Sequence, residues 1–275
     1  MIVFPNCKIN LGLHILRKRT DGFHDLETVF YPVPLTDALE IIRTEEDRTT
    51  FSHSGIELNI APSENICLKA VEMLREDFPQ IPQLKIHLHK VIPHGAGLGG
   101  GSADGAFTLK LLNRQFYLEL SEEQLIAYAL RLGSDCPFFI RNRACFATGR
   151  GEKMRDVALD LSGYDLVLVN PRIHVNTGWA FSQIRPTEER PSLEDIVLQP
   201  VSVWKEQLRN DFEPVVMAAH PEVRSIRDAL YDAGAQFAAM SGTGSTVFAL
   251  FEKNNIPQLD FPEDYFIAKL PLGKN

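Results

Sequence analysis

A dense run of glycines between residues 93 and 103 could bind an anion with its backbone. The segment reads Pro93-His-Gly-Ala-Gly-Leu-Gly-Gly-Gly-Ser-Ala103, with glycine at five of the seven positions from 95 to 101. Glycine loses more backbone entropy on folding than any other residue, so such a run indicates close approach of bare backbone to something. Several N–H groups that converge at a helix N-terminus bind anionic oxygens, which predicts a phosphate-binding loop here.

Two better-defined glycine motifs fit this segment less well. A P-loop ends in Gly-Lys-Ser/Thr, whereas the glycines here run into Ser102 with no lysine before it. The pattern Gly95-x-Gly97-x-x-Gly100 matches the dinucleotide fingerprint, which also needs a second strand that ends in an acidic residue about 20 residues later. The sequence continues instead with helical patterns, including a capping box at Ser121-Glu-Glu-Gln124. Dinucleotide binding is therefore a minor alternative.

Charged and aromatic side chains elsewhere could also take part in chemistry. Lys8 and Asn10 share one face of a predicted strand, and the pattern alone favours a solvent-exposed face. Phe23 and His24 follow a predicted hairpin turn and could stack on a flat ligand, although such a pair more often packs locally. Asp135 stands between a helix end and a buried aromatic run. Helix capping and a functional role explain that position equally well.

Two histidines could suggest a metal site, since His87 and His89 lie on one side of a predicted strand. No cysteine, aspartate or glutamate at a suitable local spacing supplies a third ligand. We therefore expect these imidazoles to lie on a solvated face, and the sequence assigns no metal-binding residue from this pattern.

The glycine loop is bracketed by the elements that would position it. Leu84, Ile86 and Leu88 alternate with polar residues, which predicts a half-buried strand before the loop. After the loop, Ser102 is expected to cap a helix and Asp104 to lie in its first turn. This order of strand, glycine loop and helix N-terminus is typical of phosphate sites.

The rest of the chain is patterned as a mixture of strands and helices. A helix capped by Ser63 is predicted, and residues 185–200 are polar and proline-containing, which predicts a surface loop. The sequence character changes near residue 160, where a second unit is expected to begin. Further strands are predicted at 3–15, 26–31, 38–42, 164–169, 236–240 and 246–251, and residues 145–151 are predicted to form a strand that runs into a turn. Further helices are predicted at 121–132, 177–181 and 223–230.

Composition bounds the class of protein. The 275 residues are 44% hydrophobic and 23% charged, as in ordinary globular proteins of one large domain or two modest ones. The net charge of −8 argues against nucleic acid or an anionic membrane as a partner. The 4 cysteines are scattered without a C-x-x-C pair, as in reduced cytosolic proteins. With no long apolar run or signal-peptide pattern, we expect a cytoplasmic protein.

Five motifs in this chain resemble, in type and order, those of the GHMP kinases. The resemblance extends nearly from end to end, and the glycine loop alone would identify only this superfamily. Lys8-Ile-Asn10 together with Asp21-Gly-Phe-His24 most resembles its members that act on a cytidyl-diphosphate sugar alcohol. The motifs are Pro5-Asn-Cys-Lys-Ile-Asn-Leu-Gly12, Asp21-Gly-Phe-His24, Pro93 to Ala103, Leu132-Gly-Ser-Asp-Cys-Pro137 and Ser241-Gly-Thr-Gly-Ser245.

The resemblance implies a fold and a reaction. The fold would be α+β, with an ATP-binding domain of the ribosomal-protein-S5-domain-2-like type at residues 1–158 and a ferredoxin-like domain at 159–275. The reaction would be ATP-dependent phosphorylation of the 2-hydroxyl of 4-diphosphocytidyl-2-C-methyl-D-erythritol in the non-mevalonate isoprenoid pathway. ATP and Mg²⁺ would be required, and the partners would be small molecules. The oligomeric state is not indicated.

The resemblance also implies a role for each matching residue. Asp135 would be the catalytic base, and Lys8 would orient the reacting groups and attract their charge. Asn10 would contact the substrate, Phe23 and Phe181 would stack on the cytosine, and His24 would bind its edge. Ser102 is a guess for a Mg²⁺ ligand. The third motif, near the phosphates, is Gly242, Thr243 and Gly244. The ATP loop would comprise Pro93, His94, Gly95, Ala96, Gly97, Leu98, Gly99, Gly100, Gly101, Ser102 and Ala103.

Two residues depart from the family pattern, and two other functions stay open. Cys7 stands where alanine is usual, and Phe23 stands where tyrosine is common, so any contact of that tyrosine hydroxyl is in doubt. The first alternative is a GHMP kinase for another small alcohol of the homoserine or mevalonate type. The second is a non-catalytic nucleotide-binding module or a dinucleotide oxidoreductase.

Overall fold

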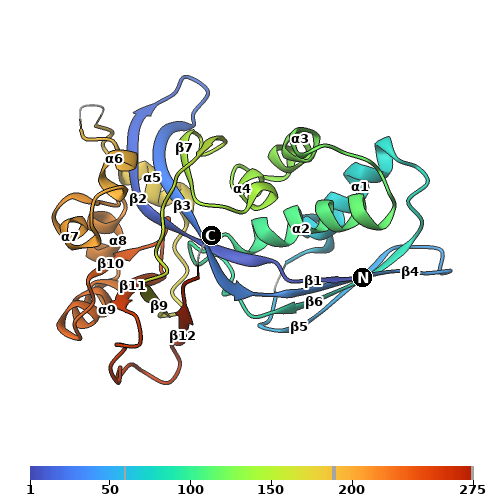
Figure 1. Ribbon diagram of the computed structural model, residues 1–275. Coiled ribbons are helices and arrows are strands. Elements are labelled where there is room, and N and C mark those ends of the chain that lie inside the picture. The colour runs from blue at the N-terminus through green and yellow to red at the C-terminus, as the bar shows by residue number, and fades with distance from the viewer. Residues whose placement is uncertain (59, 188–189, 274–275) are drawn as a thin grey trace. The chain divides into compact units, whose positions relative to one another are not determined.

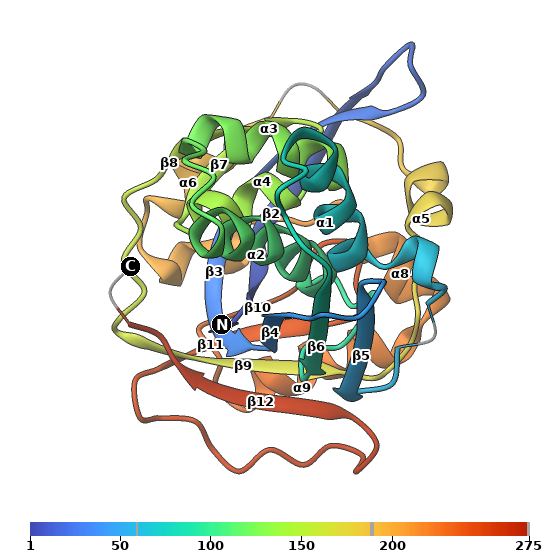
Figure 2. The ribbon, with the colours of Figure 1, turned by 90° about the vertical axis from the view of Figure 1, so that its right-hand side faces the viewer.

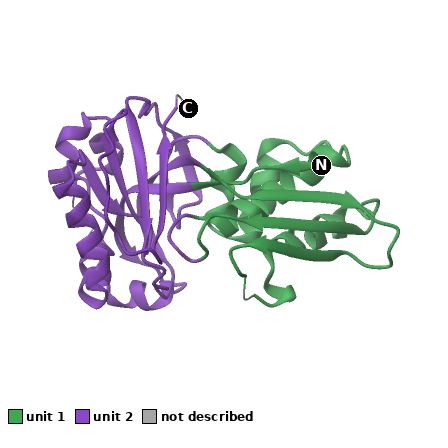
Figure 3. Cartoon of the chain, turned by 90° about the horizontal axis from the view of Figure 1, so that it is seen from below, with its two compact units in different colours: residues 1–7, 35–94, 99–142 green, residues 8–34, 95–98, 143–275 purple. Residues whose placement is uncertain are grey.

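The strands of this chain form three four-stranded sheets in the computed structural model, which describes residues 1–58, 60–187 and 190–273 (Figure 1). Together with the helices they give an α+β structure, as predicted. The chain divides into two compact units, coloured in Figure 3. The first comprises residues 1–7, 35–94 and 99–142, and the second comprises residues 8–34, 95–98 and 143–275.

These compact units do not follow the predicted boundary between residues 158 and 159. The difference arises because β3 (His24–Thr36) pairs with β7 (Cys145–Gly149), which groups an N-terminal hairpin with a later part of the chain. The predicted division at 158 is a statement about family domains and stays a prediction.

The first unit contains a mixed sheet in the order β1-β4-β6-β5, in which only the β5–β6 pair is parallel. In Figures 1 and 2, helices α1 and α2 lie along one face of this sheet. The strands are β1 (Ile2–Val3), β4 (Ala38–Arg43), β5 (Thr50–Gly55) and β6 (Leu84–Lys90). The helices are α1 (Ile66–Asp77), α2 (Gly100–Gln115), α3 (Glu122–Leu132) and α4 (Cys136–Arg141).

Local patterns explain most elements of this unit. The predicted alternation of β6 is confirmed, since Leu84, Ile86 and Leu88 are buried. The capping box at the start of α3 is also confirmed. The predicted cap of α1 is wrong: the side chain of Asn65 accepts the N–H groups of the first turn, because Ser63 lies within a preceding 3₁₀ turn, η1 (Pro62–Glu64).

The second unit contains two further sheets. One has the order β2-β3-β7-β8, with β2 (Asn6–Lys18) and β3 contributing a few terminal residues to the first unit. The other is antiparallel, in the order β10-β11-β9-β12. The remaining strands are β8 (Lys153–Asp156), β9 (Tyr164–Asn170), β10 (Phe237–Met240), β11 (Val247–Glu252) and β12 (Phe266–Pro271). The helices are α5 (Thr177–Gln183), α6 (Leu193–Val197), η2 (Val201–Val203), α7 (Trp204–Gln207), α8 (Glu213–Ala219) and α9 (Pro221–Asp232).

The core of the second unit forms where helices α8 and α9 pack on strands β9, β10 and β11. Alternate residues of the strands, such as Val167 and Ala249, meet the predicted helical stripe of Val223, Ile226 and Leu230. This packing fixes β10 and β11 and therefore the turn between them. Within the described residues, none of the helices has the length and apolarity that crossing a bilayer requires.

The predicted surface loop at 185–200 is partly wrong. It contains α6, whose Leu193, Ile196 and Val197 are buried, and residues 188–189 of the predicted loop lie outside the described residues. Ser192 caps this helix by accepting the N–H of Glu194. The one-turn apolar stripe is too short to register as a periodic pattern among polar neighbours.

Candidate active site

Lys8 and Asn10 are buried in β2, with exposed fractions of 3% and 2%, so the expected solvent-exposed face is wrong. The Lys8 ammonium donates to Oδ1 of Asn10 at 2.6 Å and to the carbonyl oxygen of Gly97 at 3.3 Å. Asn10 in turn donates from Nδ2 to the Thr28 hydroxyl at 2.9 Å. Strand periodicity shows that two residues share a face but not what covers it. Here the glycine loop and the neighbouring strand cover it.

The first part of the glycine loop is held by the turn between β10 and β11. Ser241 donates from its hydroxyl to the carbonyl of Gly97 at 2.8 Å and accepts the N–H of Asn10 at 3.2 Å. Thr246 N–H donates to the carbonyl of Ala96 at 3.3 Å. Gly97 has a φ of +79°, and a Cβ added there would lie 2.0 Å from the Ser241 carbonyl oxygen. The predicted third motif is thus a hairpin turn, and it also fixes the loop.

The last part of the loop begins α2 in the first unit. The helix begins at Gly100 after Gly99 in the left-handed region (φ +69°), so the predicted cap at Ser102 is wrong. A glycine cap starts the helix earlier and places Ser102 inside its first turn. A Cβ added to Gly101 would have no atom within 4 Å. The first N–H groups of a helix have no acceptor within it, so this turn offers donors beside open space.

Asp135 occupies the N-cap position of α4, but its side chain does not cap that helix. Capping therefore does not account for this aspartate, and its functional role stays a prediction. The neighbouring Cys136 accepts a hydrogen bond from Ser102, yet burial outweighs that bond and raises the pKa of its thiol to about 12, with the charge of Asp135 adding to the rise. Cys136 therefore stays protonated and is no nucleophile.

The aromatic residues predicted to hold a base lie in the second unit. His24 stacks on Phe181 with ring centroids 5.0 Å apart, and Phe181 meets Phe212 edge-on at 4.9 Å. The structure thus brings together two predicted residues that are far apart in sequence. Phe23 is 49% exposed, and the Arg150 guanidinium lies over its ring at 3.7 Å. No sequence pattern indicated Arg150, which lies in a short glycine-flanked turn.

The imidazole of His24 is kept neutral by its surroundings. Burial, followed by the positive charge of Lys18, lowers the pKa of His24 below its usual value of 6.5. A neutral imidazole has one donor and one acceptor nitrogen. That combination can match the polar edge of a nucleobase, as the sequence-based role requires.

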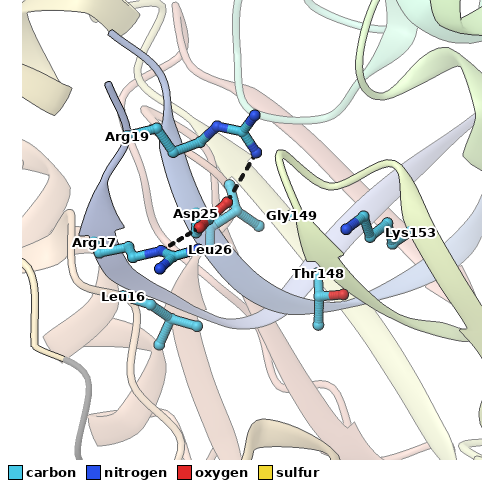
Figure 4. A pocket seen from close by; sticks show the side chains of 8 residues that line it. All are labelled: Leu16, Arg17, Arg19, Asp25, Leu26, Thr148, Gly149 and Lys153. Carbon is cyan, nitrogen blue, oxygen red and sulfur yellow. Dashed lines mark hydrogen bonds and ion pairs between the residues drawn. The ribbon is translucent and has the colours of Figure 1, made fainter. Parts of the chain in front are cut away.

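The second unit also carries a pocket of about 430 Å³, shown in Figure 4. None of the predicted site residues is among the described residues that line it. Two of its cations, Arg17 and Arg19, are held by Asp25 at 2.5 and 3.1 Å, which leaves them paired within the protein. We therefore do not place the reaction there. The lining residues are Leu16, Arg17, Arg19, Asp25, Leu26, Thr148, Gly149 and Lys153.

Comparison with known families and proteins adds an independent finding. The sequence model "GHMP kinases N terminal domain" matches residues 65–143, and "GHMP kinases C terminal" matches residues 194–259. A protein of Parabacteroides distasonis named 4-diphosphocytidyl-2-C-methyl-D-erythritol kinase is 51% identical over 92% of both chains. One of the same name from Bacteroides fragilis is 51% identical over 95% of this chain and 96% of its own.

Solved structures show the same similarity. A crystal structure of 4-(cytidine 5'-diphospho)-2C-methyl-D-erythritol kinase superposes with a TM-score of 0.81 at 28% identity, covering 99% of this chain and all of that one. Methanococcus jannaschii mevalonate kinase gives a TM-score of 0.70 at 16% identity over 99% and 98% of the two chains, which indicates a common fold.

Proposed function

The chain belongs to the GHMP kinases, and on this premise we propose that it transfers the γ-phosphoryl group of ATP to the 2-hydroxyl of 4-diphosphocytidyl-2-C-methyl-D-erythritol. Relatives that carry the name of this activity are about half identical to it over nearly the whole chain. The alternative of a dinucleotide oxidoreductase is set aside by the family itself. A small-molecule kinase of this type belongs to the non-mevalonate route to isoprenoids.

The observation that carries the proposal is the buried ammonium of Lys8 beside the glycine loop. Lys8 binds Asn10 at 2.6 Å and the loop carbonyl of Gly97 at 3.3 Å. Phosphoryl transfer depends on positioning and on positive charge near the transferred group. A lysine held by the carbonyl of Gly97 is fixed relative to that part of the loop, so its charge acts without reorganisation.

Asp135 would accept the proton of the attacking hydroxyl. Its position in the Leu132–Pro137 motif is the one to which the family resemblance assigns the catalytic aspartate, and its side chain does not cap α4. A general base contributes typically 10²- to 10⁴-fold to a rate. Asp135→Asn should therefore keep ATP binding and lose about that factor in turnover. A variant with near-normal turnover would remove Asp135 from this role.

The cytidyl end of the substrate would lie on the aromatic residues of the second unit. Phe181 is supported by Phe212 and already contacts His24, so its ring is fixed in orientation. Phe23 presents a half-exposed ring, and the Arg150 guanidinium packs against that ring and orients it. Arg150 does not substitute for the hydroxyl of the tyrosine that is common in the family at this position. Asn10 would contact the acceptor alcohol, close to Lys8.

The residues fit ATP and are compatible with Mg²⁺. Gly101 faces open space at the start of α2, where backbone donors suit phosphate oxygens. The described residues contain no cluster of three His, Cys, Asp or Glu side chains of the kind that cages a metal. Mg²⁺ usually binds through substrate phosphates with one or two protein ligands, and when bound it would neutralise charge on the β- and γ-phosphates. Ser102 as a Mg²⁺ ligand stays a prediction. Its hydroxyl forms a hydrogen bond with the Cys136 thiol, and this bond would compete with binding to the metal ion.

The product identifies the reaction. Incubation with ATP–Mg²⁺ and the cytidyl substrate should yield a compound heavier by one phosphoryl group, with a new phosphomonoester at the 2-position in ³¹P NMR. ADP formation without that signal, or a phosphomonoester at another hydroxyl, would contradict the proposed acceptor site.

A further inference from the structure

A buried cluster of three charged side chains lies directly behind the start of α2. Lys90, the last residue of β6, donates to Oδ2 of Asp104 in α2 at 2.7 Å and to Oδ2 of Asp37 at 2.5 Å. The exposed fractions of Lys90, Asp37 and Asp104 are 1%, 1% and 3%. None of the three was a predicted site residue. All belong to the first unit, so their contacts are internal to one compact body.

The cluster connects the two ends of the glycine loop. Lys90 and Asp104 are 14 residues apart, and the whole of the loop lies between them. Asp37 also accepts the N–H groups of Val91 at 2.6 Å and Ile92 at 2.9 Å, which fixes the first residues after β6. The end of β6 and the start of α2 are thus linked through the ammonium group of Lys90.

The ammonium group of Lys90 also lies beside Gly100, the first residue of α2. A Cβ added to Gly100 would lie 3.1 Å from the Lys90 Nζ and 2.8 Å from Cγ2 of Ile92. Glycine at this position therefore lets the first helical turn lie directly on the Lys90 side chain. A displacement of Lys90 would therefore shift this first turn, in which a Cβ added to Gly101 would face open space.

The cluster is poorly explained as a device for stability. Replacing a buried ion pair with apolar residues is often neutral or stabilising, because removing charges from water is costly. Burial raises the pKa of Asp104 to about 7; the Lys90 charge opposes this rise and the Asp37 charge adds to it. Burial alone would lower the pKa of Lys90, but the two carboxylates outweigh it and raise that pKa. Two carboxylates therefore share one ammonium group, an arrangement that is weak evidence for a role in stability.

We propose that the Lys90–Asp104 pair is a clasp that closes the glycine loop and holds the first turn of α2 in the orientation that binds the phosphates of ATP. Lys90 and Asp104 are positioning residues, because they act through the backbone donors of this turn. The clasp rests on the proposed function to the extent that ATP is the ligand of the loop. It adds that affinity for ATP, and not for the acceptor, depends on a charge pair buried behind the loop.

The test compares Asp104→Asn and Lys90→Met with a matched control. Asp165→Asn removes another buried carboxylate, which accepts the N–H of Asn254 at 2.7 Å in the second unit. Isothermal titration with a non-hydrolysable ATP analogue should show about tenfold or greater loss of affinity in both clasp variants, since misplaced donors lose much of their binding. The KM for the cytidyl substrate should change less than twofold, and Asp165→Asn should bind the analogue normally.

A second measurement keeps the clasp testable where a variant is less stable. Hydrogen exchange of the ligand-free protein should be faster at residues 103–107, the first amides of α2 that donate within the helix, in Asp104→Asn than in the wild type, with no such change in Asp165→Asn. Folded clasp variants with wild-type analogue affinity and wild-type exchange would overturn the inference. A wild type that binds the analogue but does not phosphorylate the cytidyl substrate would instead refute the proposed acceptor, and both clasp measurements would still apply.

Discussion

Two glycines of the same loop should respond in opposite ways to the same substitution. Gly97→Ala adds a methyl group at a φ of +79° and 2.0 Å from the Ser241 carbonyl oxygen. The left-handed conformation costs an alanine about 1–2 kcal/mol, and relieving the overlap costs about 1–3 kcal/mol more. Gly97→Ala should therefore lower the free energy of unfolding by about 2–5 kcal/mol.

Gly101→Ala is the matched control, because its methyl group meets no atom within 4 Å and its backbone is helical. Alanine is better than glycine inside a helix by about 1 kcal/mol, so stability should stay the same or rise. If the phosphates of ATP lie against this turn, the new methyl group occupies their space and weakens ATP binding. Thus Gly97→Ala loses stability, whereas Gly101→Ala loses ATP affinity alone.

Chemical denaturation without ligand gives the first quantity, and titration with a non-hydrolysable ATP analogue gives the second. Equal unfolding free energies for Gly97→Ala and the wild type would refute the close packing of Gly97 against the Ser241 carbonyl. Wild-type affinity in Gly101→Ala would remove the start of α2 from the phosphate site.

Four further predictions address single residues. Lys8→Met should retain the buried stem and lower kcat by about 10² or more, with circular dichroism unchanged; a kcat within tenfold of wild type would contradict the role of its charge. Phe181→Ala should raise the KM for the cytidyl substrate while the KM for ATP stays constant, and an unchanged KM would remove this ring from the base site. Because the pKa of His24 is lowered below 6.5, its protonation should raise the KM for the cytidyl substrate with a midpoint below pH 6.5; a midpoint above pH 6.5 would contradict this. The pKa of Asp104 is raised to about 7, so the native state binds this proton more tightly and stability from this group is lost as pH rises from about 4 to 7. Asp104→Asn lacks that loss, and its unfolding free energy relative to wild type should therefore increase over this range.

The pH dependence assigned to Asp104 requires that its other neighbours do not titrate in the same window. Cys67 on α1 faces the cluster and bonds Thr108, and burial raises the pKa of its thiol to about 12. The pKa of Lys90 is raised as well, so the ammonium stays charged. The predicted slope therefore belongs to the two carboxyl groups that share the Lys90 ammonium, Asp104 and Asp37, and Asp104→Asn removes one of them.

Local sequence patterns predicted the elements that flank the loop because those patterns report local physics. The alternation of Leu84, Ile86 and Leu88 needs only a strand with one buried face. The capping box at Ser121 depends on residues within one turn. Contacts of this kind are visible in any short window of the sequence.

Burial of polar residues was predicted poorly because it depends on contacts between distant segments. Lys8 and Asn10 were assigned to solvent, since nothing nearby shows that residues 95–98 and Ser241 cover them. Lys90 and Asp104 each look like ordinary surface residues at the ends of a strand and a helix. Their pairing becomes visible only when the loop between them is closed.

Family resemblance supplied what local patterns could not, namely the roles of residues far apart in sequence. His24 and Phe181 contact each other although they are far apart in sequence. The roles of Lys8, Asp135 and the aromatic residues in the reaction remain predictions that the variants above test. Arg150 on Phe23 lies outside the motifs on which the resemblance rests.

The most direct measurement is coupled ADP release from ATP–Mg²⁺ with a panel of acceptors: 4-diphosphocytidyl-2-C-methyl-D-erythritol, homoserine and mevalonate. The proposed function predicts turnover with the cytidyl substrate and a kcat/KM for the other two lower by several orders of magnitude. Turnover with homoserine or mevalonate alone would contradict the acceptor and the base site at Phe23, His24 and Phe181, while leaving the fold and the ATP loop in place.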